Sequence, residues 1–256
     1  MQENSGPPEE PQAGPTDAAH QKENVPIFNL PGGVLLSLAL IGIIYTLQAL
    51  VFSDDTNAWI TFEFGFSPLR YVYPLADQTL AWIWTPVSYS LLHGSFEHLA
   101  FNGLWLAAFG TPVYRRIGAV RFVIFWVISS VAGAGLHAIV NWGSPSLMVG
   151  ASGVISALMG AACRFAFGGR QRGYLQAFGI EPPLFSVPAA LADRTVRVFI
   201  IVWFLGNVAV AVGLPLFGEY AGMIAWDAHI GGFLFGFLCF RPFDPYSRSV
   251  RATRNI

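Results

Sequence analysis

The sequence predicts an all-α membrane protein with six transmembrane helices, and composition, apolar runs and the placement of arginines each support this fold class. Of 256 residues, 54% are hydrophobic and only 11% are charged, whereas soluble domains carry about 25% charged residues. Much of the surface must therefore face the lipid bilayer. A net charge of −1 gives no reason to expect a nucleic-acid partner.

The N-terminal residues differ from the rest of the chain. Residues 1–26 contain five prolines and five acidic residues but few large apolar ones, so they cannot bury enough surface to fold. They also lack the basic start and apolar core of a cleaved signal peptide. We therefore expect a disordered acidic and proline-rich cytoplasmic tail over 1–29, a six-helix membrane domain over 30–242 and a basic cytoplasmic tail over 243–256.

Six apolar runs predict the six membrane spans. The runs cover residues 32–52, 98–114, 122–140, 150–167, 198–217 and 226–240. Several reach the roughly 18–20 residues that a helix needs to cross a hydrocarbon core of about 30 Å. The stretch 80–95 is also apolar, but Pro86 and Gly94 interrupt it. We expect this stretch to form a loop that dips into the interface.

The positive charges predict the orientation of the spans. With a cytoplasmic N-terminus, 13 of the 14 Lys and Arg residues fall in cytoplasmic segments, and Arg70 is the exception. Cytoplasmic loops are expected to carry such an excess. No internal repeat is visible, which disfavours a transporter built from duplicated halves.

A serine between small residues begins the fourth run. Polar groups inside membrane spans cost free energy, so they are candidates for function. The sequence Gly150-Ala151-Ser152-Gly153 leaves the hydroxyl open and places it near a helix N-terminus, which favours a developing oxyanion. Taken alone, this pattern more often serves helix packing.

A histidine opens the last run on a glycine-lined face. His229, Gly232 and Gly236 share one side of a helix, and the glycine spacing is typical of helices in close contact. The fourth run carries a matching stripe of small residues, namely Gly153, Ala157, Gly160 and Ala161. Docking the two stripes would bring Ser152 and His229 within reach. A histidine that only bonds to a neighbouring helix is the other interpretation.

His98 and Asn102 open the second run on one helical face. Both side chains can donate hydrogen bonds, as an oxyanion hole requires, although the pair alone could merely bridge two helices. In the six-span orientation the second, fourth and sixth runs all begin on the external side. Ser152, His229, His98 and Asn102 then lie at one depth, and this coincidence favours catalysis.

Other polar residues fit this interpretation less directly. Asp227 lies two residues before His229, and such residues do not face each other on a helix, so we expect no triad. His137 and Asn207 are expected to form interhelical hydrogen bonds. The His-Glu-x-x-His spacing of a zinc site is absent, and we expect neither a metal nor an organic cofactor.

The motifs resemble those of the rhomboid intramembrane serine proteases. The resemblance runs from about residue 84 to 240 and is carried by His93 through His98 with Asn102, Phe109-Gly110, Gly150 through Gly153, Leu158-Met159-Gly160, and His229 with Gly232 and Gly236. It implies a six-helix rhomboid fold and a Ser–His dyad without cofactor or metal. Ser152 corresponds to the nucleophile and His229 to the general base. His98, Asn102 and the Ser152 backbone N–H correspond to the oxyanion donors.

One departure from the family pattern concerns the base. Family members often carry an aromatic residue one turn after the serine, stacked on the catalytic histidine. That position here is Ser156, so another group must orient His229.

The resemblance implies a serine endopeptidase that cleaves transmembrane helices of other membrane proteins, in a bacterial inner (plasma) membrane. We expect substrate access near the 214–225 loop and the fifth span. An inactive rhomboid-like protein that binds membrane clients is the alternative, but it has no reason to keep both Ser152 and His229. A small-solute transporter would need polar features along a continuous path. The sequence predicts neither the substrate's identity nor the oligomeric state.

Overall fold

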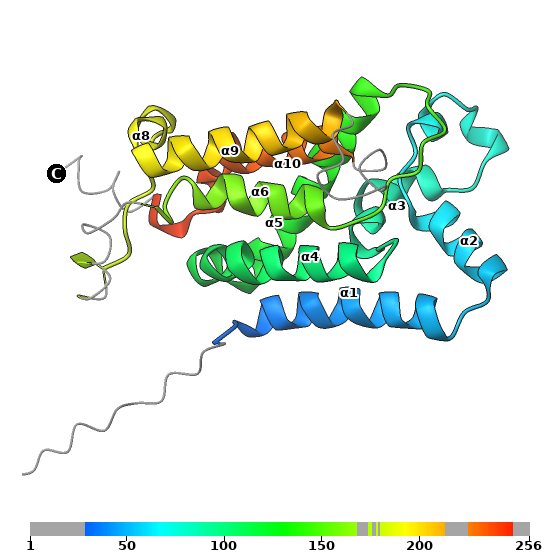
Figure 1. Cartoon of the computed structure of the whole chain (residues 1–256), viewed down its shortest axis with the longest axis horizontal. Helices are drawn as coiled ribbons and strands as arrows, with labels where there is room; N and C mark the ends of the chain where they lie inside the picture. The colour runs from blue at the N-terminus through cyan, green and yellow to red at the C-terminus, as the bar shows by residue number, and fades with distance from the viewer. Residues whose placement is uncertain (1–28, 168–173, 176–177, 179, 213–224, 248–256) are drawn as a thin grey trace, which may run out of the picture.

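The computed structural model describes residues 29–167, 174–175, 178, 180–212 and 225–247 (Figure 1). Within this part of the chain the secondary structure is helical, and the one strand-like pairing is an isolated antiparallel bridge between Phe66 and Met148. The all-α prediction is confirmed. Apart from Asn29 and Ala225, the expected N-terminal tail and the 214–225 loop lie outside the described residues, as does the chain beyond 247.

The longer helices pack side by side along one direction, with shorter ones at the ends (Figure 1). In chain order they are α1 (Gly32–Leu50), α2 (Asp54–Phe64), α3 (Ala81–Ser88), α4 (Phe96–Trp105), α5 (Thr111–Val140), α6 (Ser152–Ala162), α8 (Val187–Ala192), α9 (Arg194–Ala211) and α10 (Trp226–Cys239). Two shorter segments matter here, the 3-10 turn η3 (Tyr89–Leu91) and the π-helical turn η4 (Leu106–Gly110). By length and composition, α1, the run Phe96–Val140 and α9 are long and apolar enough to cross a membrane.

The second and third predicted spans belong to one helical run. α4, η4 and α5 follow one another from Phe96 to Val140 with no loop between them. Gly118 interrupts the regular geometry with a φ of +76°, a left-handed conformation that glycine adopts at little cost. The break lies inside the gap that the sequence predicts between the two spans.

Most of the stretch 80–95 is helical, from residue 81 to residue 91, so the prediction of a loop was wrong for this part. α3 occupies Ala81–Ser88 and continues into η3. Tyr89 explains why this segment is ordered, because its side chain is 1% exposed and its hydroxyl donates to the Ser130 carbonyl at 3.0 Å. At eight residues, α3 rises about 12 Å and is too short to cross a bilayer.

α6 is the central helix of the bundle, and every residue from Gly153 to Ala162 is buried. It is shorter than the predicted run of 150–167, because it begins at Ser152 and ends at Ala162. The buried Arg164 follows, and its guanidinium donates to the carbonyls of Phe185 and Phe237. With 11 residues, α6 rises about 16 Å, roughly half of the hydrocarbon thickness.

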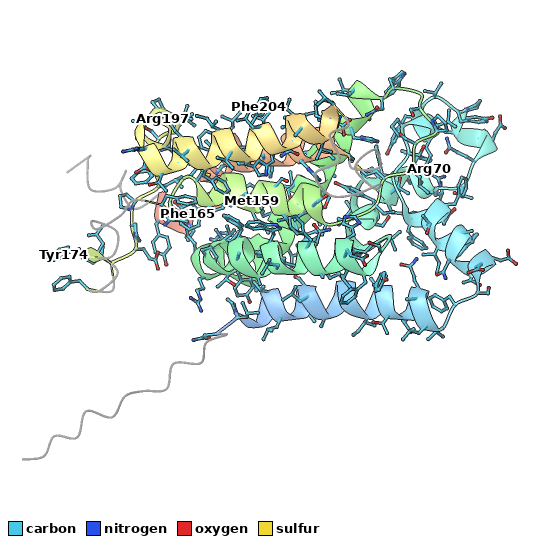
Figure 2. The ribbon with its side chains drawn as sticks, in the orientation of Figure 1. Arg70, Met159, Phe165, Tyr174, Arg197 and Phe204 are labelled. Carbon is cyan, nitrogen blue, oxygen red and sulfur yellow. The ribbon has the colours of Figure 1, made fainter. Side chains whose placement is uncertain are left out.

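Several arginines gather at one end of the bundle, with Arg194 and Arg197 at the start of α9 and Arg164 just after the end of α6. Figure 2 shows Arg197 and Phe165 near one end and Arg70 near the other. We call the first the arginine-rich end and the second, which carries α2 and α3, the loop-rich end. At the arginine-rich end α9 begins at Arg194, four residues before the predicted start, because Asp193 caps it by accepting from the N–H groups of Thr195 and Val196. The predicted end of this span at 217 lies outside the described residues.

Candidate functional site

Ser152 and His229 meet at the loop-rich end. Ser152 is the first residue of α6 and His229 lies in the first turn of α10. The Ser152 Oγ and the His229 Nε2 are 2.8 Å apart, within hydrogen-bond distance. Both side chains are half-buried. A hydroxyl and an imidazole from two separate helices are thus in direct contact.

Glycines bring the helices that carry this pair together. A β-carbon built on Gly232 would overlap the carbonyl oxygen of Gly153, and one built on Gly236 would overlap that of Ala157. On α5, a β-carbon on Gly133 would lie 3.1 Å from the Ala228 carbonyl oxygen. Backbones that touch in this way require small residues. The contact between Ser152 and His229 therefore depends on the two glycine stripes.

The segment that leads into Ser152 is tied to the loop between α2 and α3. Phe66 and Met148 exchange two backbone hydrogen bonds, of 2.8 and 3.0 Å. The Gly150 N–H donates to the Tyr89 carbonyl at 2.9 Å. Among the described residues no side chain caps α6, so the N–H groups of its first turn, including that of Ser152, are available to a negatively charged group.

His98 and Asn102 lie against this same segment. Gly150 has a φ of +124° and lies just before α6, so it is outside the helix, whereas helix packing was one interpretation of the Gly150–Gly153 pattern. A β-carbon built there would lie 2.7 Å from the His98 Nε2 and 3.7 Å from the Asn102 Nδ2. Asn102 is 2% exposed, and its Nδ2 meets no acceptor among the described residues. Two side-chain donors therefore flank the approach to Ser152.

Asn207 makes the second contact of the His229 ring. Its Oδ1 lies 2.8 Å from the His229 Nδ1, so it links α9 to α10. The prediction that Asn207 bonds between helices is confirmed. Its partner was missed, because only the packing of α9 on α10 reveals it. The signal in the sequence was a lone amide in an otherwise apolar span.

Asp227 belongs to a different polar cluster. Its carboxylate lies 2.7 Å from the His137 Nδ1 and accepts from the Asn141 Nδ2 at 2.6 Å. It also accepts from the backbone N–H of Ala228. The prediction of an interhelical bond at His137 is confirmed, and Asn141 was not anticipated. Asp227 thus braces α10 against α5, and its hydrogen bonds do not reach His229.

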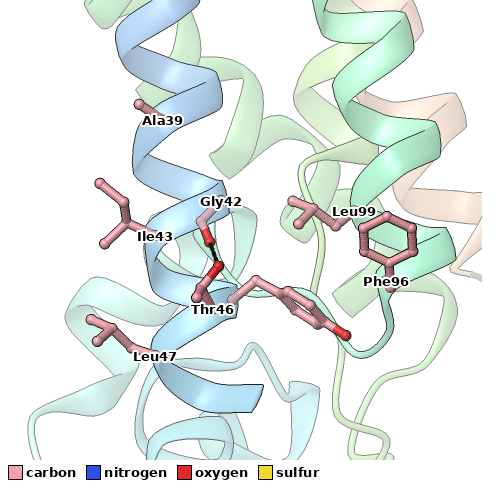
Figure 3. A pocket seen from close by; sticks show the side chains of 8 residues that line it. Ala39, Gly42, Ile43, Thr46, Leu47, Phe96 and Leu99 are labelled. Carbon is pink, nitrogen blue, oxygen red and sulfur yellow. Dashed lines mark hydrogen bonds between the residues drawn. The ribbon is translucent and has the colours of Figure 1, made fainter. Parts of the chain in front are cut away.

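An apolar groove of about 470 Å³ lies apart from these polar residues, between α1 and the start of α4 (Figure 3). Its walls include Ile43 and Leu47 from α1 with Phe96 and Leu99 from α4. The Thr46 hydroxyl, at its edge, donates to the Gly42 carbonyl of its own helix. The lining contains neither Ser152 nor His229.

Known proteins resemble the chain over most of this structure. The Rhomboid protease GlpG of Serratia proteamaculans is 24% identical over 201 residues, which cover 78% of this chain and 59% of the relative. GlpG of Haemophilus influenzae is 29% identical over 128 residues, covering 49% of this chain and 58% of the relative. GlpG of Pectobacterium atrosepticum is 25% identical over 209 residues, covering 81% and 61%. The chain thus spans about three fifths of the length of these relatives.

A family model describes the larger part of the chain directly. The model of the Rhomboid domain matches residues 80–243, which include α3, every helix from α4 to α10 and all the site residues named above. Because this match covers well over half of the 256 residues, the chain belongs to the rhomboid family and is a multi-pass membrane protein.

Proposed function

We propose that this chain is an intramembrane serine endopeptidase that cleaves transmembrane helices of other membrane proteins. The contact of 2.8 Å between the Ser152 Oγ and the His229 Nε2 carries this proposal. A serine hydroxyl becomes a useful nucleophile when an adjacent base accepts its proton. In the proposed mechanism His229 takes the proton as Ser152 attacks the scissile carbonyl, and it later returns the proton to the leaving amine.

Three donors are available for the oxyanion that this attack creates. We assign them to the Ser152 backbone N–H, the Asn102 Nδ2 and the His98 ring. The buried Asn102 Nδ2, which lacks an acceptor among the described residues, is the kind of preorganised donor that gains an acceptor only when charge develops. Loss of one such donor typically costs about 2.7–4 kcal/mol of transition-state stabilisation.

Hydrolysis within a membrane also requires water at the site. Ser152, His229 and His98 are each half-buried and thus remain partly accessible. α6, which carries Ser152, has 11 residues and is shorter than a full-length span, so we place its start below the level at which such a span would begin. Polar groups at membrane depth are tolerated where they line a water-filled cavity. These features support a water-accessible site that is open at the loop-rich end.

The proposal includes a topology. We assign six spans to α1, α4 with its continuation to Gly118, the remainder of α5, α6, α9 and α10, within a membrane domain over residues 30–242. Both termini are then cytoplasmic, because the arginine-rich end faces the cytoplasm. A bacterial inner membrane fits the bacterial relatives, which are named rhomboid proteases. The substrate class follows from this placement, because the site can reach only segments within or beside the bilayer.

Cleavage and active-site labelling by the full chain in liposomes test the proposal together. A transmembrane peptide with a helix-breaking residue near its outer end serves as substrate, and a fluorophosphonate probe reports the activated serine. We expect the wild type to cleave and label, and Ser152→Ala and His229→Ala each to lose about 10³-fold or more of the cleavage rate. Ser129→Ala is the matched control, because this buried hydroxyl donates to the Trp126 carbonyl of its own helix and has no other hydrogen bond among the described residues.

The same assay separates the alternative function. An inactive relative that binds membrane clients would retain the peptide without cleaving it and would not react with the probe. That result in a correctly folded wild type would overturn the proposal.

A further inference from the structure

The second nitrogen of the His229 ring has a partner on a different helix. On the basis of the proposed function, we infer that Asn207 on α9 is a positioning residue, which holds His229 in the tautomer and ring orientation that a general base requires. The distance from the Asn207 Oδ1 to the His229 Nδ1 is 2.8 Å. Asn207 is then the third residue in a hydrogen-bonded series that runs from Ser152 through His229 to Asn207.

The orientation of the Asn207 amide follows from its other hydrogen bond. Its Nδ2 donates to the backbone carbonyl of Trp203, one turn earlier on α9, at 2.9 Å. A carbonyl oxygen can only accept, so the NH₂ group must face Trp203. The amide oxygen therefore faces His229.

This orientation decides the tautomer of the imidazole. The Asn207 Oδ1 is an acceptor, so the His229 Nδ1 must carry the hydrogen. In the neutral ring the Nε2 then has a lone pair, and this lone pair faces the Ser152 Oγ at 2.8 Å. The serine O–H donates to it, which is the arrangement needed for proton transfer. The opposite tautomer would direct an N–H at the serine and could not accept its proton.

The packing of α9 on α10 supports this hydrogen bond one turn away. The Trp203 and Phe233 rings stack with centroids 4.4 Å apart and an interplanar angle of 23°. Trp203 lies four residues before Asn207, and Phe233 lies four residues after His229, so the two contacts are adjacent on the antiparallel helices. The stack and the hydrogen bond thus set one register between α9 and α10.

Two other residues near His229, Ser156 and Asp227, do not orient its ring. Ser156, one turn after Ser152, is too small to stack on the ring. Asp227 is committed to His137 and Asn141. Among the residues that the structure describes, the titratable groups that act on His229 electrostatically are His98 on α4 and Asp227 on its own helix. A neutral amide orients the ring without a further charge in the membrane, where a charge is expensive.

Kinetic measurements in liposomes test the assignment. We expect Asn207→Ala and the similarly sized Asn207→Leu to lower kcat roughly 10- to 100-fold, part of the 10²–10⁴-fold that a positioned acid–base group typically contributes, with little change in KM. Asn207→Asp keeps an acceptor, so it should retain cleavage. Its carboxylate should also move the acidic limb of the rate profile to higher pH, because it stabilises the protonated imidazole. Val208→Ala, at an exposed neighbouring position on α9, is the control and should match the wild type.

The tautomer of His229 can also be measured directly, without an assay of cleavage. In protein with ¹⁵N-labelled histidine, the His229 signals, assigned by their loss in His229→Gln, should show the Nδ1–H form in the wild type. We expect Asn207→Leu to lose this form or to mix it with the other. Wild-type kinetics in Asn207→Ala, or an unchanged tautomer in Asn207→Leu, would overturn the role of Asn207. Failure of the wild type to cleave would overturn the proposed function instead, and the tautomer would still report on Asn207.

Discussion

Asp227 on α10 binds His137 on α5, with 2.7 Å between the carboxylate oxygen and the Nδ1, and not the histidine two residues further along its own helix. Residues two positions apart on a helix do not face each other, so the sequence predicts that Asp227 does not contact His229. The structure shows that its partner is His137 instead. His137 and His229 thus have different neighbours. One is held by a carboxylate at the α5–α10 junction, and the other is held by the amide of Asn207.

The carboxylate cluster should matter for stability rather than chemistry. Asp227→Ala leaves the buried His137 without its carboxylate partner and removes one of the two acceptors of the half-buried Asn141. We expect it to lower the free energy of unfolding by about 3 kcal/mol. Asp227→Asn keeps an acceptor for His137 and should cost less. Unfolding in detergent micelles measures both variants, with the exposed Asp55→Ala as a control that should change stability little. Complete loss of cleavage in a fully stable Asp227→Asn would instead place Asp227 in the mechanism.

The glycine stripe makes a second prediction. The β-carbon of Gly232→Ala overlaps the Gly153 carbonyl, so α6 and α10 must separate and the contact between Ser152 and His229 must lengthen. We expect loss of most fluorophosphonate labelling and a destabilisation of about 1–3 kcal/mol, as overpacking usually causes. The control is Gly135→Ala on α5, where an added β-carbon meets no atom of the described residues within 4 Å. This control should be neutral or slightly stabilising, since alanine favours helix, and equal loss in both variants would contradict the packing argument.

Features that appear in the sequence as apolar runs or as stripes of small residues were predicted. The all-α class and the boundaries of α1 and α10 follow from continuous apolar stretches. The helical fold of residues 81–91 could not be predicted in this way. Tyr89 packs beside Gly133 and Gly153, which are far away in the chain.

The hydrogen-bond partners of the polar residues could not be predicted from the sequence either. Asn207 and His137 stood out as polar groups in apolar spans, but their partners lie 22 and 90 residues away. Which partner each one meets depends on helix packing. Likewise, the count of arginines indicated an orientation and gave no sign that Arg116 and Arg164 are buried.

The backbone at Gly150 makes a third prediction. Gly150→Ala combines a φ of +124° with a β-carbon only 2.6 Å from the His98 ring, so the ring must move away from Ser152. We expect cleavage to fall by roughly 10²-fold or more, as loss of an oxyanion donor does, while the fold persists. Gly143→Ala is the matched control, because Gly143 also has a positive φ, of +75°, but among the described residues its β-carbon meets only Val72, at 3.5 Å. Gly143→Ala should cost about 1–2 kcal/mol of stability and keep its activity. Equal activity of the two variants would exclude a role for His98 placement.

The arginine-rich end makes the last prediction, because a buried ion pair joins segments that are far apart in sequence. Arg116 donates from its Nε and Nη2 to the two Asp244 carboxylate oxygens at 3.1 and 3.0 Å. Its Nη1 donates to the Pro182 carbonyl at 2.9 Å. The two side chains are 1% and 0% exposed. Arg116 therefore links the start of α5 to the segment after α10 through Asp244, and to the connection before α8 through Pro182.

Removing one partner leaves the other charge buried, so we expect Arg116→Met to destabilise the protein by about 3–5 kcal/mol. The double variant Arg116→Met with Asp244→Leu removes both charges and should be more stable than Arg116→Met alone, since apolar replacement of a buried pair is often tolerated. Arg115→Met, at the exposed neighbouring position, is the control and should stay close to wild type. Unfolding of all three variants in the same micelles gives the comparison. If Arg115→Met and Arg116→Met lose equal stability, the loss comes from a general requirement for positive charge at this end of the bundle and not from the ion pair.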